Sequence, residues 1–127
     1  MAIDFVGLEQ AAQASAAVST PCSCDQAHLL AWQQVPLTLE LDQFEEVASL
    51  VEDPFAEPTF AEYHPAGTRL ESDDAPIAPR YYPANRSHLL RCVKCGRHYL
   101  RYTEAGGYFS EFRIRALRPE LLVDATV

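Results

Sequence analysis

The apolar and polar positions of the C-terminal third alternate with a period of two residues, which is typical of β-strands. The alternation runs through residues 88–92, 98–103 and 111–116, and Glu-Ala-Gly-Gly at 104–107 supplies a turn between the last two. The pattern predicts an antiparallel β-meander with one apolar and one polar face. The apolar positions are Leu90, Cys92, His98, Leu100, Tyr102, Phe112, Ile114 and Ala116. The positions between them, which the pattern assigns to the polar face, are Tyr99, Arg101, Thr103, Glu111, Arg113 and Arg115.

The N-terminal half carries helical patterns instead. Residues 4–18 are rich in alanine and predict a first helix. Asp25 is a favourable N-cap for a short second helix that ends before Pro36, and residues 37–41 alternate like a short strand. The buried stripe expected for the first helix consists of Phe5, Leu8 and Ala12.

The clearest helical pattern follows Asp42. This residue is a favourable N-cap, and Glu45 three residues later completes a capping box. Four apolar residues recur at i, i+3, i+4 and i+7, which predicts a helix with one buried face that ends before Pro54. In such a helix Glu45 and Glu46 face the solvent. The four apolar residues are Phe44, Val47, Ala48 and Val51.

The remaining segments complete the domain. Residues 54–86 hold six of the nine prolines and little periodicity, which predicts an irregular acidic loop over the core. Pro119 suits the first position of a short helical turn. A chain of 127 residues, 48% hydrophobic and 22% charged, is ordinary for one globular domain. We therefore expect a single α+β domain over residues 1–127, with helices in residues 1–53 and the meander at 88–117.

Four cysteines add candidate chemistry. Cys22 and Cys24 form one close pair, and Cys92 and Cys95 form a second pair that Gly96 follows. Two short loops can each present two sulfurs to one ion, and four thiolates complete a tetrahedral zinc site without an open position. Glycine also suits the left-handed backbone that such a turn often needs. The sequence therefore favours a structural Zn²⁺ ion that ties the N-terminal helices to the meander.

Other uses of these cysteines stay open. A redox C-x-x-C pair normally begins a helix, whereas Cys92 and Cys95 lie in a strand-turn-strand pattern. Four thiolates also bind iron, and the cysteines can instead be unrelated buried or disulfide-linked residues. His98 is close enough to Cys95 to replace one ligand, but its apolar-face position favours a core histidine.

The segment Cys-Val-Lys-Cys-Gly between two predicted strands resembles the knuckle of a zinc ribbon, over residues 88–104. Its second half differs, because Cys22-Ser-Cys24 has one residue fewer between its sulfurs than a usual knuckle. Zinc ribbons often bind nucleic acid, so the resemblance implies an alternative function through a basic sheet face with aromatic side chains for stacking. The residues available for it are Arg91, Lys94, Arg97, Arg101, Arg113, Arg115, Tyr99, Tyr102 and Phe109.

The net charge of −8 argues against non-specific binding to nucleic acid. Residues 40–74 carry eleven acidic residues and one cation, and residues 86–118 carry eight cations and two acidic residues. This segregation suits either a basic protein partner or two solvated faces that attract each other. The candidate partner-binding residues are Glu52, Asp53, Glu57, Glu62, Glu71, Asp73 and Asp74.

Several signals for cellular location and for catalysis are missing from the sequence. No stretch reaches the about 20 apolar residues that span a bilayer, and the N-terminus lacks the basic region of a signal peptide. We therefore expect a cytoplasmic protein with reduced thiols. The sequence holds no motif of serine hydrolases, P-loop NTPases, zinc proteases or dinucleotide enzymes, so we expect no catalytic activity.

The C-terminal half also resembles small acidic bacterial immunity proteins, which neutralise toxins delivered by neighbouring cells. Over about residues 88–122, Leu-x-Cys-x-x-Cys-Gly-x-x-Tyr is followed by an acidic residue, a Gly-Gly turn, an aromatic strand and Arg-x-Leu-x-Pro-Glu-Leu. The resemblance implies an inhibitor that covers the active site or basic surface of a toxin. If the toxin is a nuclease, it implies that the acidic side chains stand in for phosphates.

Overall fold

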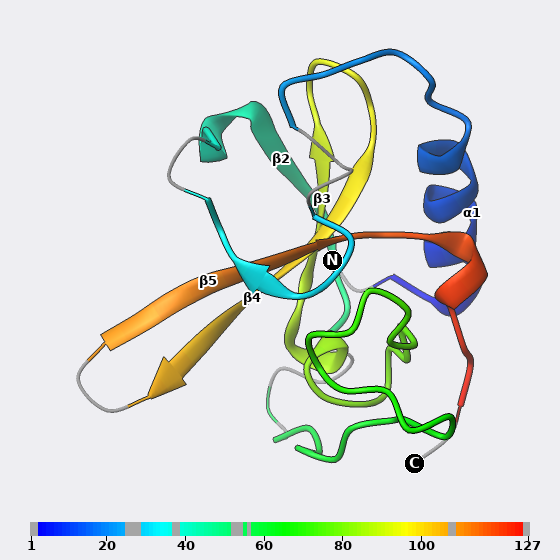
Figure 1. Ribbon diagram of the computed structural model, residues 1–127, viewed down its shortest axis with the longest axis vertical. Coiled ribbons are helices and arrows are strands. Elements are labelled where there is room, and N and C mark those ends of the chain that lie inside the picture. Colours follow the sequence, from blue (N-terminus) through cyan, green and yellow to red (C-terminus); the bar gives the residue numbers. More distant parts are fainter. Residues whose placement is uncertain are drawn as a thin grey trace.

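A computed structural model describes residues 3–24, 29–36, 39–51, 55, 57–106 and 109–125. Over these residues one helix and a five-stranded antiparallel sheet confirm the α+β class (Figure 1). The helix is α1 (Phe5–Ala16), and the strands are β1 (Gln33–Gln34), β2 (Phe44–Ser49), β3 (His88–Cys92), β4 (His98–Gly106) and β5 (Phe109–Ala116). Short 3-10 turns are η2 (Leu41–Gln43), η3 (Ala84–Arg86) and η4 (Pro119–Leu121).

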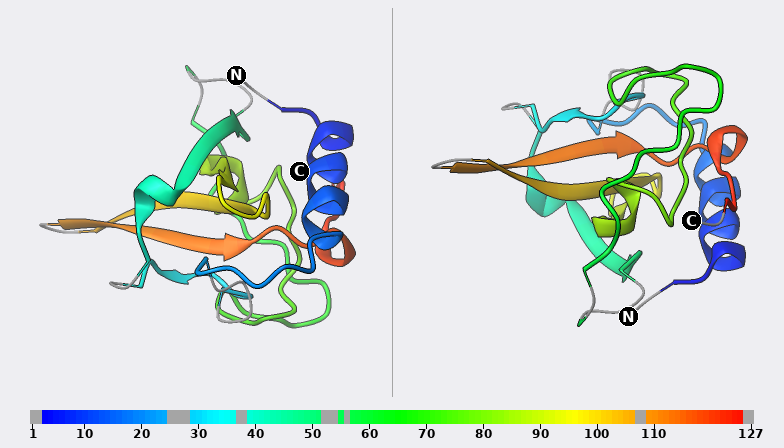
Figure 2. Two further views of the ribbon diagram at one scale, coloured as in Figure 1. Left: turned by 90° about the horizontal axis from the view of Figure 1, so that it is seen from above. Right: turned by 90° about the horizontal axis from the view of Figure 1, so that it is seen from below.

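The sheet has the order β1-β5-β4-β3-β2, so the meander predicted for the C-terminal third forms its centre. Figure 2 shows α1 at one end of this sheet and the β4–β5 hairpin extending from the other end. The predicted helical turn after the meander is η4, with Pro119 at its first position. No helix among the described residues combines the length and apolar character needed to cross a bilayer.

Both faces of the central strands are buried, so the prediction of one polar face is wrong. On one face, Leu100 lies opposite Leu89, and both pack in a cluster with α1 and with the loop before β3. On the other face, Tyr99 lies opposite Leu90 in a second cluster that includes the cysteines. Alternation predicted the strands correctly, but a second covering layer turns the apparent polar face into core. The first cluster contains Leu8, Ala12, Trp32, Ala48, Leu50, Ile77, Ala84, Leu89, Leu100, Tyr102 and Leu117. The second contains Cys24, Leu29, Leu90, Cys92, Tyr99, Ile114 and Ala116.

The first helix is confirmed, and its packing reaches the sheet. The carboxylate of Asp4 caps α1 by accepting a hydrogen bond from the Gly7 N–H at 2.8 Å. Leu8, Ala12 and Ser15 are the buried residues of α1. The hydroxyl of Ser15 accepts a hydrogen bond from the backbone N–H of His98 at 2.9 Å, which fixes the end of α1 on β4.

The helix predicted after Asp42 is wrong, because this segment forms η2 and then strand β2. A register shift between Glu46 and Ala48 explains the misleading pattern. It lets Phe44 pack in the cysteine-containing cluster while Ala48 packs in the other one, and Val47 is left 38% exposed. A β-bulge thus produced apolar spacings that resemble those of a helix. Glu45 and Glu46 are exposed, as expected.

The remaining N-terminal predictions are also wrong where the structure describes them. The helix predicted from Asp25 falls partly on residues 25–28, which lie outside the described residues, and its end forms strand β1. Of the strand predicted at 37–41, residues 37–38 lie outside the described part, and Leu41 begins η2. In contrast, the described residues of the 54–86 loop are irregular apart from η3 and one bridge between Ile77 and Leu122.

Candidate metal centre

The four cysteines converge on one place in the fold. Cys22 and Cys24 follow α1, Cys92 ends β3, and Cys95 lies in the turn before β4. Their Sγ atoms all lie within 4.8 Å of one another. The Cys22 and Cys92 sulfurs are 3.7 Å apart, and those of Cys24 and Cys95 are 3.6 Å apart. None of the four is in a disulfide. Residues 70 positions apart in the sequence thus share one cluster of free thiols.

The spacing of these sulfurs is compatible with a metal site. A zinc ion with Zn–S bonds of about 2.3 Å separates its sulfur ligands by about 3.8 Å, since a tetrahedral edge is about 1.6 times the bond length. Two of the sulfur pairs, at 3.6 and 3.7 Å, agree with that value. Cys24 and Cys92 are completely buried, and Cys22 and Cys95 are partly buried. Four sulfurs at these positions would complete the coordination shell without a water molecule.

Two backbone hydrogen bonds close the turn between β3 and β4. The N–H of Gly96 donates to the carbonyl of Cys92 at 2.8 Å, and the N–H of Cys92 donates to the carbonyl of Arg97 at 2.8 Å. Gly96 has a φ of 86°, and a Cβ atom there would meet nothing within 4 Å. The glycine is therefore required by backbone conformation and not by crowding, as the sequence predicted.

Hydrogen-bond donors surround the sulfurs on the two sides of the cluster. The Nε2 of Gln43 lies 3.5 Å from the Cys22 sulfur and 3.3 Å from the Cys92 sulfur. The Tyr99 hydroxyl donates to the Cys24 sulfur at 3.1 Å. Gln43 is 5% exposed and Tyr99 is completely buried. Donors of this kind stabilise thiolates and orient metal ligands.

Arg97 lies beside Cys95 and connects it to the segment after α1. Its backbone N–H lies 3.5 Å and its Nη1 3.7 Å from the Cys95 sulfur. Its Nη2 donates to the carbonyl of Val18, just beyond α1, at 3.3 Å. Sequence reasoning missed Gln43, Arg97 and Tyr99 as neighbours of the cysteines. The only signal for Tyr99 and Arg97 was their position just after the C-x-x-C turn, and Gln43 had none.

The metal-free thiols have unequal acidities. Burial raises the pKa of Cys24 to about 12, although the hydrogen bond from Tyr99 opposes the increase. Burial also raises the pKa of Cys92, but the hydrogen bonds from Gln43 and from backbone N–H groups of the turn outweigh it and lower the pKa to about 6. The pKa of Cys95 is raised, with burial as the largest cause. A bound divalent cation would supply the charge that favours all four thiolates together.

His98 is not among the groups that could hold a metal with these cysteines. It is partly buried, and burial, together with the charge of Arg91, lowers its pKa. His98 belongs to neither of the two buried clusters, so its interpretation as a core histidine stays a prediction.

The acidic candidates are partly described. Glu52 and Asp53 lie outside the described residues. Glu57 and Glu62 are exposed; the first lies 4.0 Å from Arg86 and the second 2.8 Å from His64. Glu71, Asp73 and Asp74 are exposed and have no ion pair within the described part of the chain.

The cations considered for nucleic acid do not share one face of the sheet. Arg101 lies opposite Ile114, on the face of the cysteine-containing cluster, whereas Arg115 lies opposite Leu100 on the other face. Arg91 pairs with Glu45 at 2.7 Å, Arg113 pairs with Glu111 at 2.6 Å, and Arg97 bonds to Cys95. Lys94 is exposed. Tyr99 and Tyr102 are buried and unavailable for stacking on bases, and the side chain of Phe109 lies outside the described part.

Comparison with known proteins gives no relative: no family model, curated protein or solved structure matches this chain.

Proposed function

We propose that the four cysteines hold a structural zinc ion and that the protein acts by binding, without catalysis. The observation that carries the proposal is that four sulfurs from two distant segments lie within 4.8 Å of one another, with two pairs at 3.7 and 3.6 Å. A closed four-cysteine ion has no coordination position for a substrate, so its chemistry is that of a structural link. The ion would join the segment after α1 to the β3–β4 turn.

The stabilisation expected from such an ion is large. Structural zinc contributes about 10–16 kcal/mol of apparent binding free energy at neutral pH, whereas a domain is typically stable by about 5–15 kcal/mol. Removal of the ion is therefore expected to unfold the chain or to melt the cysteine-containing cluster. Circular dichroism before and after strong chelation measures this loss.

Metal content tests the site directly. Protein produced with added zinc should contain one zinc ion per chain by elemental analysis, and Cys24→Ser should remove it. Val93→Ser is the matched control, because Val93 lies in the same turn and is 53% exposed. One iron ion per chain, with its visible absorption, would correct the metal's identity. Absence of any stoichiometric metal from folded wild-type protein would refute the site.

We further propose that the partner is a protein with a basic surface, and that the chain is an immunity protein that covers a toxin. Glu71, Asp73 and Asp74 support this, because they are exposed, adjacent and without ion pairs among the described residues. Three exposed carboxylates in one short segment raise the rate of encounter with a basic partner and favour it over acidic ones.

The partner is identified by capture from lysate, followed by expression of the captured protein alone and together with this chain. The proposal expects growth arrest in the first case and rescue in the second. Neutralising the three acids (Glu71→Gln, Asp73→Asn, Asp74→Asn) should slow association most at low salt. The matched control neutralises Glu9, Glu120 and Asp124, which are exposed elsewhere. Equal effects of the two triple variants would refute the acidic segment as the binding surface.

A further inference from the structure

A buried arginine with unpartnered N–H groups lies in the core on the face of the sheet away from the cysteines. Arg115, on β5, is 0% exposed. Its Nη2 donates to the carbonyl of Leu30 at 3.2 Å, but its Nε and Nη1 have no hydrogen-bond partner among the described residues. Buried charges in proteins are normally paired, because an uncompensated ion loses its hydration without replacement.

A second guanidinium lies beside the first. The Nη2 of Arg118 donates to the same carbonyl of Leu30 at 3.4 Å and also to the carbonyl of Asp73. The Nε of Arg118 is likewise buried without a partner in the described part of the chain. Two cations therefore converge on one carbonyl oxygen. Neither forms an ion pair with a described carboxylate.

The two arginines repel each other, and the charge of Asp73 compensates this only in part. Burial and the charge of Arg118 lower the pKa of Arg115 to about 10, while Asp73 acts in the opposite direction. Arg115 therefore keeps its positive charge at neutral pH. Two other titratable side chains that line the cavity already have partners: His64 bonds to Glu62 and Thr68 at 2.8 Å each, and the Tyr82 hydroxyl donates to Glu104 at 2.7 Å.

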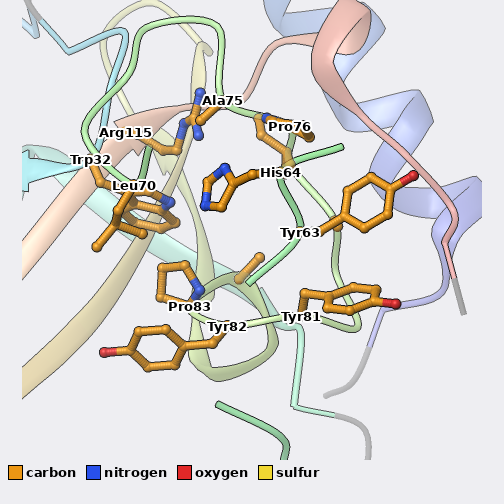
Figure 3. Close-up of a pocket in the computed structure, with 13 residues that line it drawn as sticks. Trp32, Tyr63, His64, Leu70, Ala75, Pro76, Tyr81, Tyr82, Pro83 and Arg115 are labelled. Atoms are coloured by element: carbon orange, nitrogen blue, oxygen red, sulfur yellow. The ribbon is translucent and has the colours of Figure 1, made fainter. Parts of the chain in front are cut away.

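A cavity lies at this guanidinium. Arg115 lines it together with Trp32, His64 and Ala75, and Figure 3 shows the Arg115 side chain beside Ala75 with the rings of Trp32 and His64 next to it. The guanidinium carbon is 5.9 Å from the centre of the Trp32 ring. The cavity has a volume of about 10 Å³, which accommodates roughly one water-sized group.

We propose that this cavity is an anion site, and that its ligand is one small anionic group, either a halide ion or the oxygen of a carboxylate. The site is built from the unpartnered N–H groups of Arg115, with Arg118 as the second positive charge. Its size excludes a nucleotide or a sugar phosphate from the interior. The anion would supply the missing counter-charge between the sheet and the 54–86 loop. This proposal does not depend on the metal centre or on the partner.

Chloride alone is the first probe. Its binding to the folded, metal-loaded protein is detected by the line width of the ³⁵Cl resonance. We expect excess broadening with wild type and none with Arg115→Met, which has similar length and no charge. Arg91→Met is the matched control, because Arg91 is exposed on strand β3, which β4 separates from β5, and should leave the broadening unchanged. Identical line widths for wild type and Arg115→Met would overturn the proposal and assign the cavity to a water molecule.

A stability measurement gives an independent readout. At chloride about ten times its Kd, linkage favours the folded state about elevenfold, so the unfolding midpoint of wild type should rise with chloride at constant ionic strength. Arg115→Met should show no such dependence. If Arg115→Met does not fold, Arg115→Lys replaces it and should show weakened broadening, while an unchanged signal counts against the site. Displacement of chloride by formate would identify a site that accepts a carboxylate. If formate leaves the chloride broadening unchanged, the site is specific for a halide.

Discussion

Removing the hydroxyl of Tyr99 should weaken metal binding without removing a metal ligand. The hydroxyl donates to the Cys24 sulfur at 3.1 Å inside the core. Burial, together with the nearby Cys24, raises the pKa of Tyr99, so the hydroxyl keeps its proton and remains a donor. Tyr99→Phe retains the ring, which packs edge-to-face on Phe44 with centroids 5.3 Å apart. The change is therefore confined to one hydrogen bond.

The magnitude follows from the charge of the acceptor. A hydrogen bond to a charged group is worth about 1.5–3 kcal/mol, and a metal-bound cysteine is a thiolate. The loss corresponds to roughly a 10- to 150-fold weaker metal affinity, since about 1.4 kcal/mol is a factor of ten. Loss of groups that bond to metal ligands typically costs about 10–100-fold. We expect Tyr99→Phe to fall in the range that these two values share.

The first assay is competition for zinc against a chelator of known affinity. The second measures the absorption of the cobalt-substituted protein. Tyr102→Phe is the matched control, because Tyr102 is equally buried but belongs to the cluster on the other face of the sheet. Its hydroxyl contacts no cysteine among the described residues. An affinity change below twofold for Tyr99→Phe, or an equal change in both variants, would refute the reasoning.

Other predictions concern the fold. Leu100→Ala should lower the free energy of unfolding by about 2–5 kcal/mol in denaturant titration, because Leu100 is completely buried; a loss below about 1 kcal/mol would contradict its place in the core. Gly96→Ala should cost about 1–2 kcal/mol, since its φ is 86°, and an unchanged midpoint would argue against that backbone. Asp4→Ala should cost about 1 kcal/mol through loss of the α1 cap, while Asp4→Asn should keep most of it. Burial lowers the pKa of His98 below its ordinary value of about 6.5, so the unfolded chain binds this proton more readily. Stability should therefore fall as the pH drops below about 6.5, and His98→Gln should reduce that slope relative to wild type; parallel curves would contradict the assignment.

Local patterns were sufficient for some elements. The alternation at 88–116 needed only the period of a strand, and Asp4 with the alanine-rich segment after it needed only capping and helix propensity. Two close cysteine pairs and Gly96 indicated a shared site, because short-range geometry lets each pair present two sulfurs. In each case the signal lies within a few residues of the structure that it predicts.

Tertiary structure decided what local patterns could not. Residues 44–49 have helical spacing, yet pairing with β3 and a bulge place Phe44 and Ala48 in different cores. Tyr99 was assigned to a polar face, but a second layer buries it against Cys24. The spacing of residues along one strand carries no information about whether a remote segment covers its outer face.

The sequence by itself therefore determined the α+β class, the central meander, the first helix and the four residues of the candidate metal centre. Only the tertiary structure decided that both faces of the sheet are buried, that Gln43 and Tyr99 bond to the sulfurs, and that Arg115 lines a cavity without an ion pair to any described carboxylate. The physical reason is the separation along the chain over which each effect acts. Backbone periodicity and capping act over a few residues, whereas burial and electrostatic pairing depend on which distant segments the folded chain brings together.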